Sequence, residues 1–168
     1  MKHTFIIVII LSLILACEKD STGPEETVPG ISLAVPNSEI EVGQKTNVKV
    51  NLDLKGHSIF GVSMGINYLP YLVTFDDPTD FMPGDYFGGK EISFIKKYEN
   101  SIHLTFSLTQ GQAKVNGVGN LAVFRFTGAN KGLGYIEIIP EQLHFYDTDG
   151  SEITIPDIKI NDLKILVE

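Results

Sequence analysis

The stretch Ile59–Phe75, IFGVSMGINYLPYLVTF, decides the fold class of this chain. From Phe60 to Tyr68, large apolar side chains alternate with small or polar ones, the period of a strand with one buried face and one open face. Leu69-Pro70 breaks the alternation because proline donates no hydrogen bond to a sheet and keeps its predecessor extended or in a turn. A second apolar run, Leu72–Phe75, follows at once. The pattern predicts two strands separated by a bend, as in a β-sandwich where the chain passes between sheets.

Further strand candidates follow one another along the chain after residue 30. The clearest is Thr46–Leu54, TNVKVNLDL, which alternates apolar and polar residues throughout. Outside the N-terminal leader, no window of about a dozen residues shows the helical period of about 3.6 residues. The candidates are 31–35, 39–42, 46–54, 60–68, 72–75, 92–95, 101–108, 120–127, 135–139, 143–146, 153–155 and 158–167. We therefore predict one all-β domain over residues 31–168.

The N-terminus has the pattern of an export signal. Residues 1–16, MKHTFIIVIILSLILA, place one lysine before a short apolar run that ends in a small residue. This run is shorter than the roughly twenty residues of a membrane span but has the length of a signal-peptide core. Ile14–Cys17, ILAC, resembles the lipobox of bacterial lipoproteins, in which the leader is removed before a cysteine that carries lipid. Since Cys17 is the only cysteine, no disulfide can form within the chain, and we expect lipidation there.

Residues 17–30 and the overall charge indicate where the domain is located and which class of partner it excludes. Residues 18–30, EKDSTGPEETVPG, are too polar to bury a core, so we expect a flexible tether between the lipid and the domain. The formal net charge is -8, and an acidic surface of this kind repels nucleic-acid phosphates. We therefore predict a module in the cell envelope, lipid-anchored and facing the periplasm or the cell exterior, that binds no nucleic acid.

Over nearly the whole mature domain, the chain resembles a cohesin domain, the receptor module of cellulosome scaffolds. The residues that carry the resemblance are the ordered segments ISLAVPNSEIEVGQKTNVKVNL, GINYLPYLVTF, MPGDYF, ISF, IHLTFS, GVGNLAVFRF and LHFYDTDGSEI. The resemblance implies a nine-stranded β-sandwich of jelly-roll topology. It also implies a dockerin module of another secreted protein as the partner, in polysaccharide degradation.

In that family the binding face is a four-stranded sheet, which here would comprise residues 61–67, 91–97, 101–109 and 135–139. The residues that the resemblance places on its solvent side are Gly61, Ser63, Asn67, Ser93, Ile95, His103, Thr105 and Ser107. The chain departs from the family at Tyr68-Leu69-Pro70, where Tyr-Asp-Pro is usual, and at Gly61 and Ser63, where a polar pair is common. Dockerin specificity therefore does not carry over.

Two alternative functions remain open at this stage. The chain has no tryptophan, but tyrosines and phenylalanines in or near the loop of residues 76–89 could form a sugar-binding platform: Tyr71, Phe81, Tyr86, Phe87 and Tyr98. The competing expectation is that Phe81, Met82 and Phe87 fold back to cap the sandwich. The other alternative is a structural or adhesive surface lipoprotein.

No motif in the sequence indicates catalysis, a metal or a cofactor. The segment 147–152, DTDGSE, begins like a calcium loop but lacks its full spacing and terminal glutamate, so we expect a β-turn. His57, His103 and His144 are far apart in sequence, and no serine lies in a nucleophile motif. We predict a binding protein rather than an enzyme.

Overall fold

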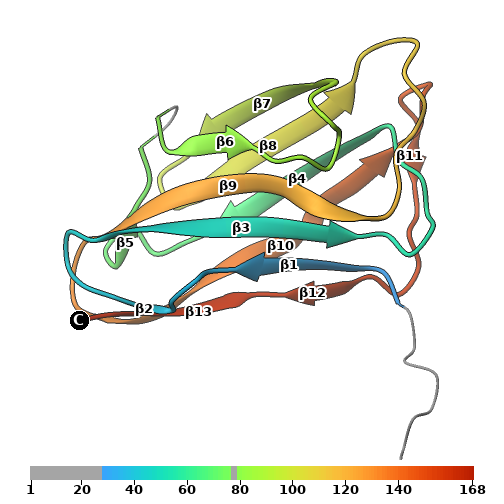
Figure 1. The fold of residues 1–168 in the computed structure, drawn as a ribbon. Coiled ribbons are helices and arrows are strands. Elements are labelled where there is room, and N and C mark those ends of the chain that lie inside the picture. The colour runs from blue at the N-terminus through green and yellow to red at the C-terminus, as the bar shows by residue number, and fades with distance from the viewer. Residues whose placement is uncertain (1–27, 77–78) are drawn as a thin grey trace, which may run out of the picture.

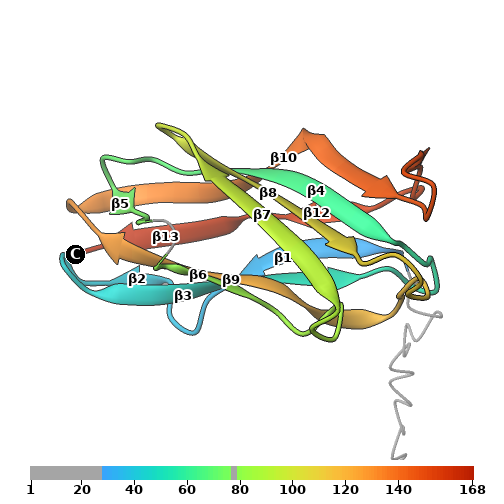
Figure 2. The same ribbon diagram turned by 90° about the horizontal axis from the view of Figure 1, so that it is seen from above.

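The computed structural model describes residues 28–76 and 79–168. The predicted leader, Cys17 and most of the predicted tether lie outside the described residues. Within the described ranges there is no α-helix, and hence no helix that could cross a membrane. Strands form two sheets packed face to face: Figure 1 looks onto one of them, and Figure 2 shows the sandwich from above. The prediction of an all-β sandwich is confirmed.

The first sheet contains six strands in the order β12-β1-β3-β9-β5, with β6 also pairing to β9. Its strands are β1 (Gly30–Ala34), β3 (Lys45–Asp53), β5 (Val73–Thr74), β6 (Phe81–Pro83), β9 (Val118–Gly128) and β12 (Lys159–Asn161). The antiparallel pair β3 and β9 forms its centre. In Figure 1 this sheet faces the viewer.

The second sheet contains seven strands in the order β2-β13-β10-β4-β8-β7, with β11 also pairing to β10. Its strands are β2 (Glu39–Ile40), β4 (Gly61–Asn67), β7 (Glu91–Lys97), β8 (Ser101–Leu108), β10 (Gly132–Tyr146), β11 (Glu152–Ile153) and β13 (Leu163–Val167). The described residues thus form thirteen strands rather than nine, because several short segments pair over only two or three residues.

The passage between sheets lies where the sequence predicts it. β4 is in the second sheet, whereas β5, which follows the break at Leu69-Pro70, pairs with β9 in the first. The backbone N–H of Leu72 donates to the carbonyl of Leu69, which closes the turn between the two strands. Residues 59–75 therefore connect the two layers.

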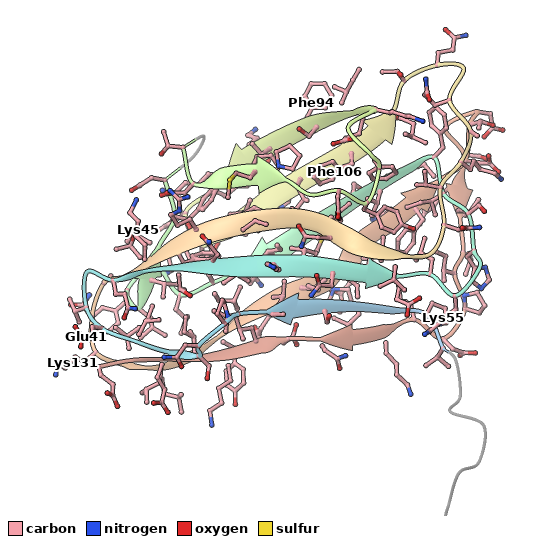
Figure 3. The ribbon with its side chains drawn as sticks, in the orientation of Figure 1. Glu41, Lys45, Lys55, Phe94, Phe106 and Lys131 are labelled. Atoms are coloured by element: carbon pink, nitrogen blue, oxygen red, sulfur yellow. The ribbon has the colours of Figure 1, made fainter. Side chains whose placement is uncertain are left out.

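The core fills the space between the sheets with aliphatic and aromatic side chains. Phe75, Phe106, Phe124 and Phe126 are almost fully buried, and the ring centroids of Phe75 and Phe124 lie 5.6 Å apart. Phe124 and Phe126 both point inward from β9. Figure 3 shows Phe106 between the two layers.

One predicted pair of strands is a single irregular strand. Residues 135–139 and 143–146 both belong to β10, and the register with β4 shifts between Ile139 and His144. Pro140 lies within this shift, where the missing N–H breaks no regular ladder. The irregular segment changes the surface of β4, because its Gln142 side chain lies over Gly65.

Candidate functional site

The sheet order brings the predicted face together. β7, β8, β4 and β10 are consecutive neighbours, so the segments 91–97, 101–108, 61–67 and 135–139 lie side by side. All three pairings are antiparallel, and the one between β10 and β4 contains the register shift after Ile139. The outer side of this four-stranded region is the candidate site.

Small side chains form the middle of this outer side. Ser63 pairs with Thr105, and Gly61 with Ser107, whereas their neighbours Val62, Met64, Leu104 and Phe106 point into the core. Residues that face one another across a ladder share a face, so these small residues all point outward. We call this surface the floor: Gly61, Ser63, Gly65, Thr105 and Ser107. His103 and Asn67 continue it toward its other end, beside Gly65 and Ser101.

Two predicted solvent-facing residues lie on the opposite side. Ser93 pairs with Phe106 and Ile95 with Leu104, and both partners are buried. Ser93 and Ile95 therefore face the interior, and Ile95 packs against the core. The prediction that they face solvent is wrong by one residue of register, which is enough to exchange the two faces of a strand. The hairpin turn sets that register through the Tyr98 N–H, which donates to the carbonyl of Ser101.

The residues of β7 that do face outward are Ile92, Phe94 and Lys96. Ile92 is 50% exposed and Phe94 is 67% exposed, a large apolar area on an edge strand. Figure 3 shows Phe94 projecting away from the layers at β7, in contrast to Phe106. We call this row the β7 wall. Because three of the four residues from Ile92 to Ile95 are apolar, the alternation in this segment does not show which of them are buried.

The other side of the floor is bordered by β10, through Glu137, Ile139, His144 and Tyr146, which pair with outward-facing residues of β4. Gln142, in the irregular segment, lies directly over Gly65, where a Cβ atom would collide with its Oε1. That Oε1 is buried without a hydrogen-bond partner. We call these five residues the β10 wall; sequence reasoning missed Gln142, because only the register shift brings it over β4.

Two hollows lie along the floor and share Thr105. One, of about 270 Å³, is lined by Ser63, Met64, His103, Leu104, Thr105, Gln142 and His144. The other, of about 410 Å³, is lined by Phe60, Gly61, Thr105, Phe106, Ser107, Tyr146 and residues 147–150. The hydroxyls of Ser63 and Tyr146 lie 3.2 Å apart and tie the floor to the β10 wall. The site is a shallow trough with a polar floor rather than a deep cleft.

Charged groups lie at the margins of the trough. The Lys96 ammonium lies 5.0 Å from the ring centroid of Tyr98, whose ring is 4.6 Å from that of His103. On the β10 side, His144 Nδ1 is 2.8 Å from Glu152 Oε1. The Thr148 backbone N–H and the Lys114 ammonium lower the pKa of Asp147, and the Ser151 hydroxyl and N–H lower that of Asp149.

Residues 147–151 of the predicted turn 147–152 form a turn, and Glu152 begins β11. The Gly150 N–H donates to the carbonyl of Asp147, and the Asp147 N–H donates to that of Ser151. Both carboxylates accept hydrogen bonds from within this turn. Across the described ranges, no three or more His, Cys, Asp and Glu side chains come together as metal ligands.

The aromatic residues considered for sugar binding do not form one surface. Tyr86 and Phe87 are buried, and the ring of Phe81 packs on Phe106 and Phe124. Phe81 and Phe87 therefore fold back onto the sandwich, whereas Met82 is 42% exposed. Tyr71 and Tyr98 remain exposed, on different loops.

Comparison with solved structures shows which known fold this chain shares. A non-cellulosomal cohesin from the archaeon Archaeoglobus fulgidus matches with a TM-score of 0.66 at 13% identity, covering 84% of this chain and 91% of that one. The fold is that of a cohesin. The cohesin of a type II cohesin–X-dockerin complex from Acetivibrio cellulolyticus matches with a TM-score of 0.69 at 16% identity, over 83% and 99% of the chains. Type II cohesin A11 from Bacteroides cellulosolvens gives 0.68 at 15% identity, over 83% and 99%. The sequence matches no family model and no curated protein.

Proposed function

We propose that this chain is a cohesin-like binding module that docks a dockerin-like module of another secreted protein. The observation that carries the proposal is the trough: a floor of small, uncharged side chains on β4 and β8, bordered by larger ones on β7 and β10. Small residues allow close approach of a partner's backbone, and the exposed Phe94 supplies apolar area at one margin.

The fold supports this proposal in a second way. Several structural neighbours are cohesins in complex with dockerins, such as the type II complex from Acetivibrio cellulolyticus. At identities this low, residue-level specificity does not transfer, so the partner must be found by experiment.

The proposed activity is binding rather than catalysis. The candidate face offers hydroxyls, amides and histidines along a shallow surface, without an arrangement of a nucleophile, a base and an oxyanion site. A shallow polar surface bordered by apolar residues suits a macromolecular partner better than a small substrate, which is usually enclosed.

The proposal also includes a lipid anchor at Cys17 and a location at the cell envelope. If Cys17 carries lipid and residues 18–30 form a tether, the module is held at the cell envelope while its trough stays open to secreted proteins. A role in polysaccharide degradation would follow from the partner, with the chain acting as its receptor.

A capture experiment tests the proposal. The detergent-solubilised full chain is immobilised and incubated with secreted proteins of the source organism, and retained proteins are identified by mass spectrometry. Thr105→Arg blocks the floor, and Ser32→Arg places the same side chain on the outer side of β1 in the other sheet. We expect the unmodified chain and Ser32→Arg to retain a protein with the duplicated calcium loop of a dockerin, and Thr105→Arg to lose it.

Two outcomes would contradict the proposal. Equal retention by Thr105→Arg would remove the trough as the binding surface. Retention of no such protein, together with heat of binding to polysaccharides in calorimetry, would favour a carbohydrate-binding module instead.

A further inference from the structure

Among the described residues, β7 is the long strand that ends a sheet. The other strands at the sheet margins are β12, β5 and β6 in the first sheet and β2 and β11 in the second, and each has only two or three residues. β7 has seven residues, and within the described ranges it pairs with β8 alone. Figure 1 shows it near the upper margin of the molecule. Proteins usually shorten or block such an edge, because a free strand edge pairs with other chains.

The hydrogen bonds to β8 show which backbone groups of β7 face the open edge. The Thr109 N–H donates to the carbonyl of Lys90, and the Tyr98 N–H donates to that of Ser101. Hydrogen-bonded pairs alternate along an antiparallel ladder, so the even-numbered residues of β7 direct their N–H and C=O groups toward β8. The odd-numbered residues direct theirs away from β8: Glu91, Ser93, Ile95 and Lys97.

This edge is complementary to a second copy of itself. Two antiparallel β7 strands can align with Phe94 opposite the Phe94 of the second copy. In that register Glu91 faces Lys97 of the second copy, and Ser93 faces Ile95. Both members of each pair have backbone groups on the open edge, so each pair can exchange two hydrogen bonds. The two exposed Phe94 rings meet on the outer side of the joined sheet, where an aromatic pair is favourable.

The charged ends of β7 also fit this register. One carboxylate oxygen of Glu91, Oε2, is buried and has no hydrogen-bond partner among the described residues. Leaving such an oxygen unpaired is costly, and Lys97 of the second copy would lie on the same side of the joined sheet. Within one chain, the Lys97 ammonium is 3.9 Å from a carboxylate oxygen of Asp76, which is longer than a hydrogen bond. Its donors are therefore available to a second copy.

Neighbouring registers lose this fit. Sliding one strand by two residues keeps the backbone pattern but changes which side chains face each other. In one direction Glu91 faces Glu99 of the second copy. In the other direction Glu91 faces Ile95, and Lys96 faces Lys90. Like charges directly opposite one another are destabilising, so charge selects the register between these two.

We propose that two copies of this chain associate through β7, antiparallel and with Phe94 at the twofold axis, so that one continuous sheet runs through both copies. Pairing through this edge goes beyond the proposed docking function and needs no docking partner. A single strand pair is a small interface, so we expect a reversible dimer with a Kd of roughly 10–500 µM. If Cys17 carries lipid, confinement to one membrane raises the effective concentration of the chains and favours the dimer.

Disulfide trapping tests the register. In a non-hydrogen-bonded antiparallel pair the Cα atoms are about 4.5 Å apart, within the range of a disulfide. In the detergent-solubilised full chain with oxidised glutathione, Phe94→Cys should form an intermolecular disulfide through position 94. Mass spectrometry of the linked peptides distinguishes this disulfide from one through Cys17. Ile92→Cys, about 14 Å from its counterpart in this register, and Val118→Cys, exposed on β9, are controls that should not cross-link.

Charge exchange tests the contact between the ends of the strands. Sedimentation equilibrium of the full chain in density-matched detergent measures dimerisation without a docking partner. Lys97→Glu and Glu91→Lys each place like charges opposite one another, so each should weaken dimerisation roughly three- to tenfold. The double variant should restore it, because opposite charges face each other again. Lys97 is exposed, so Lys97→Glu tests the contact without disturbing the core, and Lys49→Glu, on the outer side of β3, should have no effect.

Each outcome bears on the proposal. A chain that stays monomeric up to about 500 µM would overturn it. Trapping at position 94 that is no greater than at position 92 or 118, or a double variant as weak as the single ones, would also overturn it. Because no docking partner is present in these measurements, such a failure would leave the docking function standing. Equally, a capture experiment that retains no dockerin-like protein would leave the β7 dimer standing.

Discussion

Replacing Phe94 with alanine separates binding from stability. The side chain is 67% exposed, and burying a whole aromatic side chain removes roughly 200 Å² from water. A partner that covers the exposed part would therefore bury about 130 Å², worth about 3 kcal/mol at about 25 cal/mol per Å². Since alanine retains part of this area, we expect Phe94→Ala to lose about 2 kcal/mol of binding free energy, a roughly thirtyfold rise in Kd.

The same substitution should change folding little. Only the remaining third of the Phe94 surface is covered in the free protein, so we expect the free energy of unfolding to fall by less than about 1.5 kcal/mol. Phe106→Ala, at a buried position on the neighbouring strand, should instead cost about 3–5 kcal/mol. Calorimetry with the partner and urea unfolding measure the two quantities. Wild-type affinity in a folded Phe94→Ala variant would refute the assignment of the β7 wall to the interface.

Three further predictions concern the scaffold. Gly84→Ala would drive a Cβ atom into a backbone carbonyl of β9, so we expect the free energy of unfolding, measured by thermal unfolding, to fall by about 1–3 kcal/mol. Gly30→Ala meets only an ordinary contact and should be nearly neutral. Equal effects of the two substitutions would contradict the close approach of Gly84 to β9. Burial raises the pKa of Tyr86 to about 12, so the unfolded chain loses this proton first and stability should fall as pH rises from about 10 to 12. Burial also raises the pKa of Tyr68, so absorbance at 295 nm should show a late-titrating tyrosine component that decreases, without vanishing, in Tyr86→Phe; an unchanged titration would refute it. The pKa of Asp147 is lowered in the folded chain, so the ionised carboxylate stabilises the fold above its unfolded pKa, and this stabilisation is lost as pH falls through the folded pKa. Carboxyl NMR should show the pKa of Asp147 rising in Lys114→Ala. An unchanged pKa would exclude the ion pair with Lys114 as a cause of the shift.

Much of the fold could be predicted because its strands alternate cleanly. In Gly61–Asn67 and Ser101–Leu108 every second side chain is large and apolar, so their inner and outer faces could be read directly. The proline at position 70 marked the passage to the other sheet, which the structure confirms. Gly61, Ser63, Asn67, His103, Thr105 and Ser107 lie on the outer side as expected, and their role in binding stays a prediction.

The walls of the trough could not be predicted in the same way. On β7 the residues Ile92, Phe94 and Ile95 are all apolar, so burial alone permits either phase, and the hairpin turn decides it. On β10 the register shift after Ile139 brings Gln142 over β4, a contact between distant segments that no local pattern reports. Features that depend on pairing between strands therefore needed the structure.

The most direct test of the central claim is to map the interface on the folded chain. Backbone and side-chain NMR signals are assigned and followed as the dockerin-like module is added. The account predicts that the largest changes fall on Ser63, Phe94, Thr105 and Ser107, with the outer side of β1, β3 and β9 unaffected. Changes confined to the β1–β3–β9 side, or to loops at the ends of the sandwich, would contradict docking through the trough.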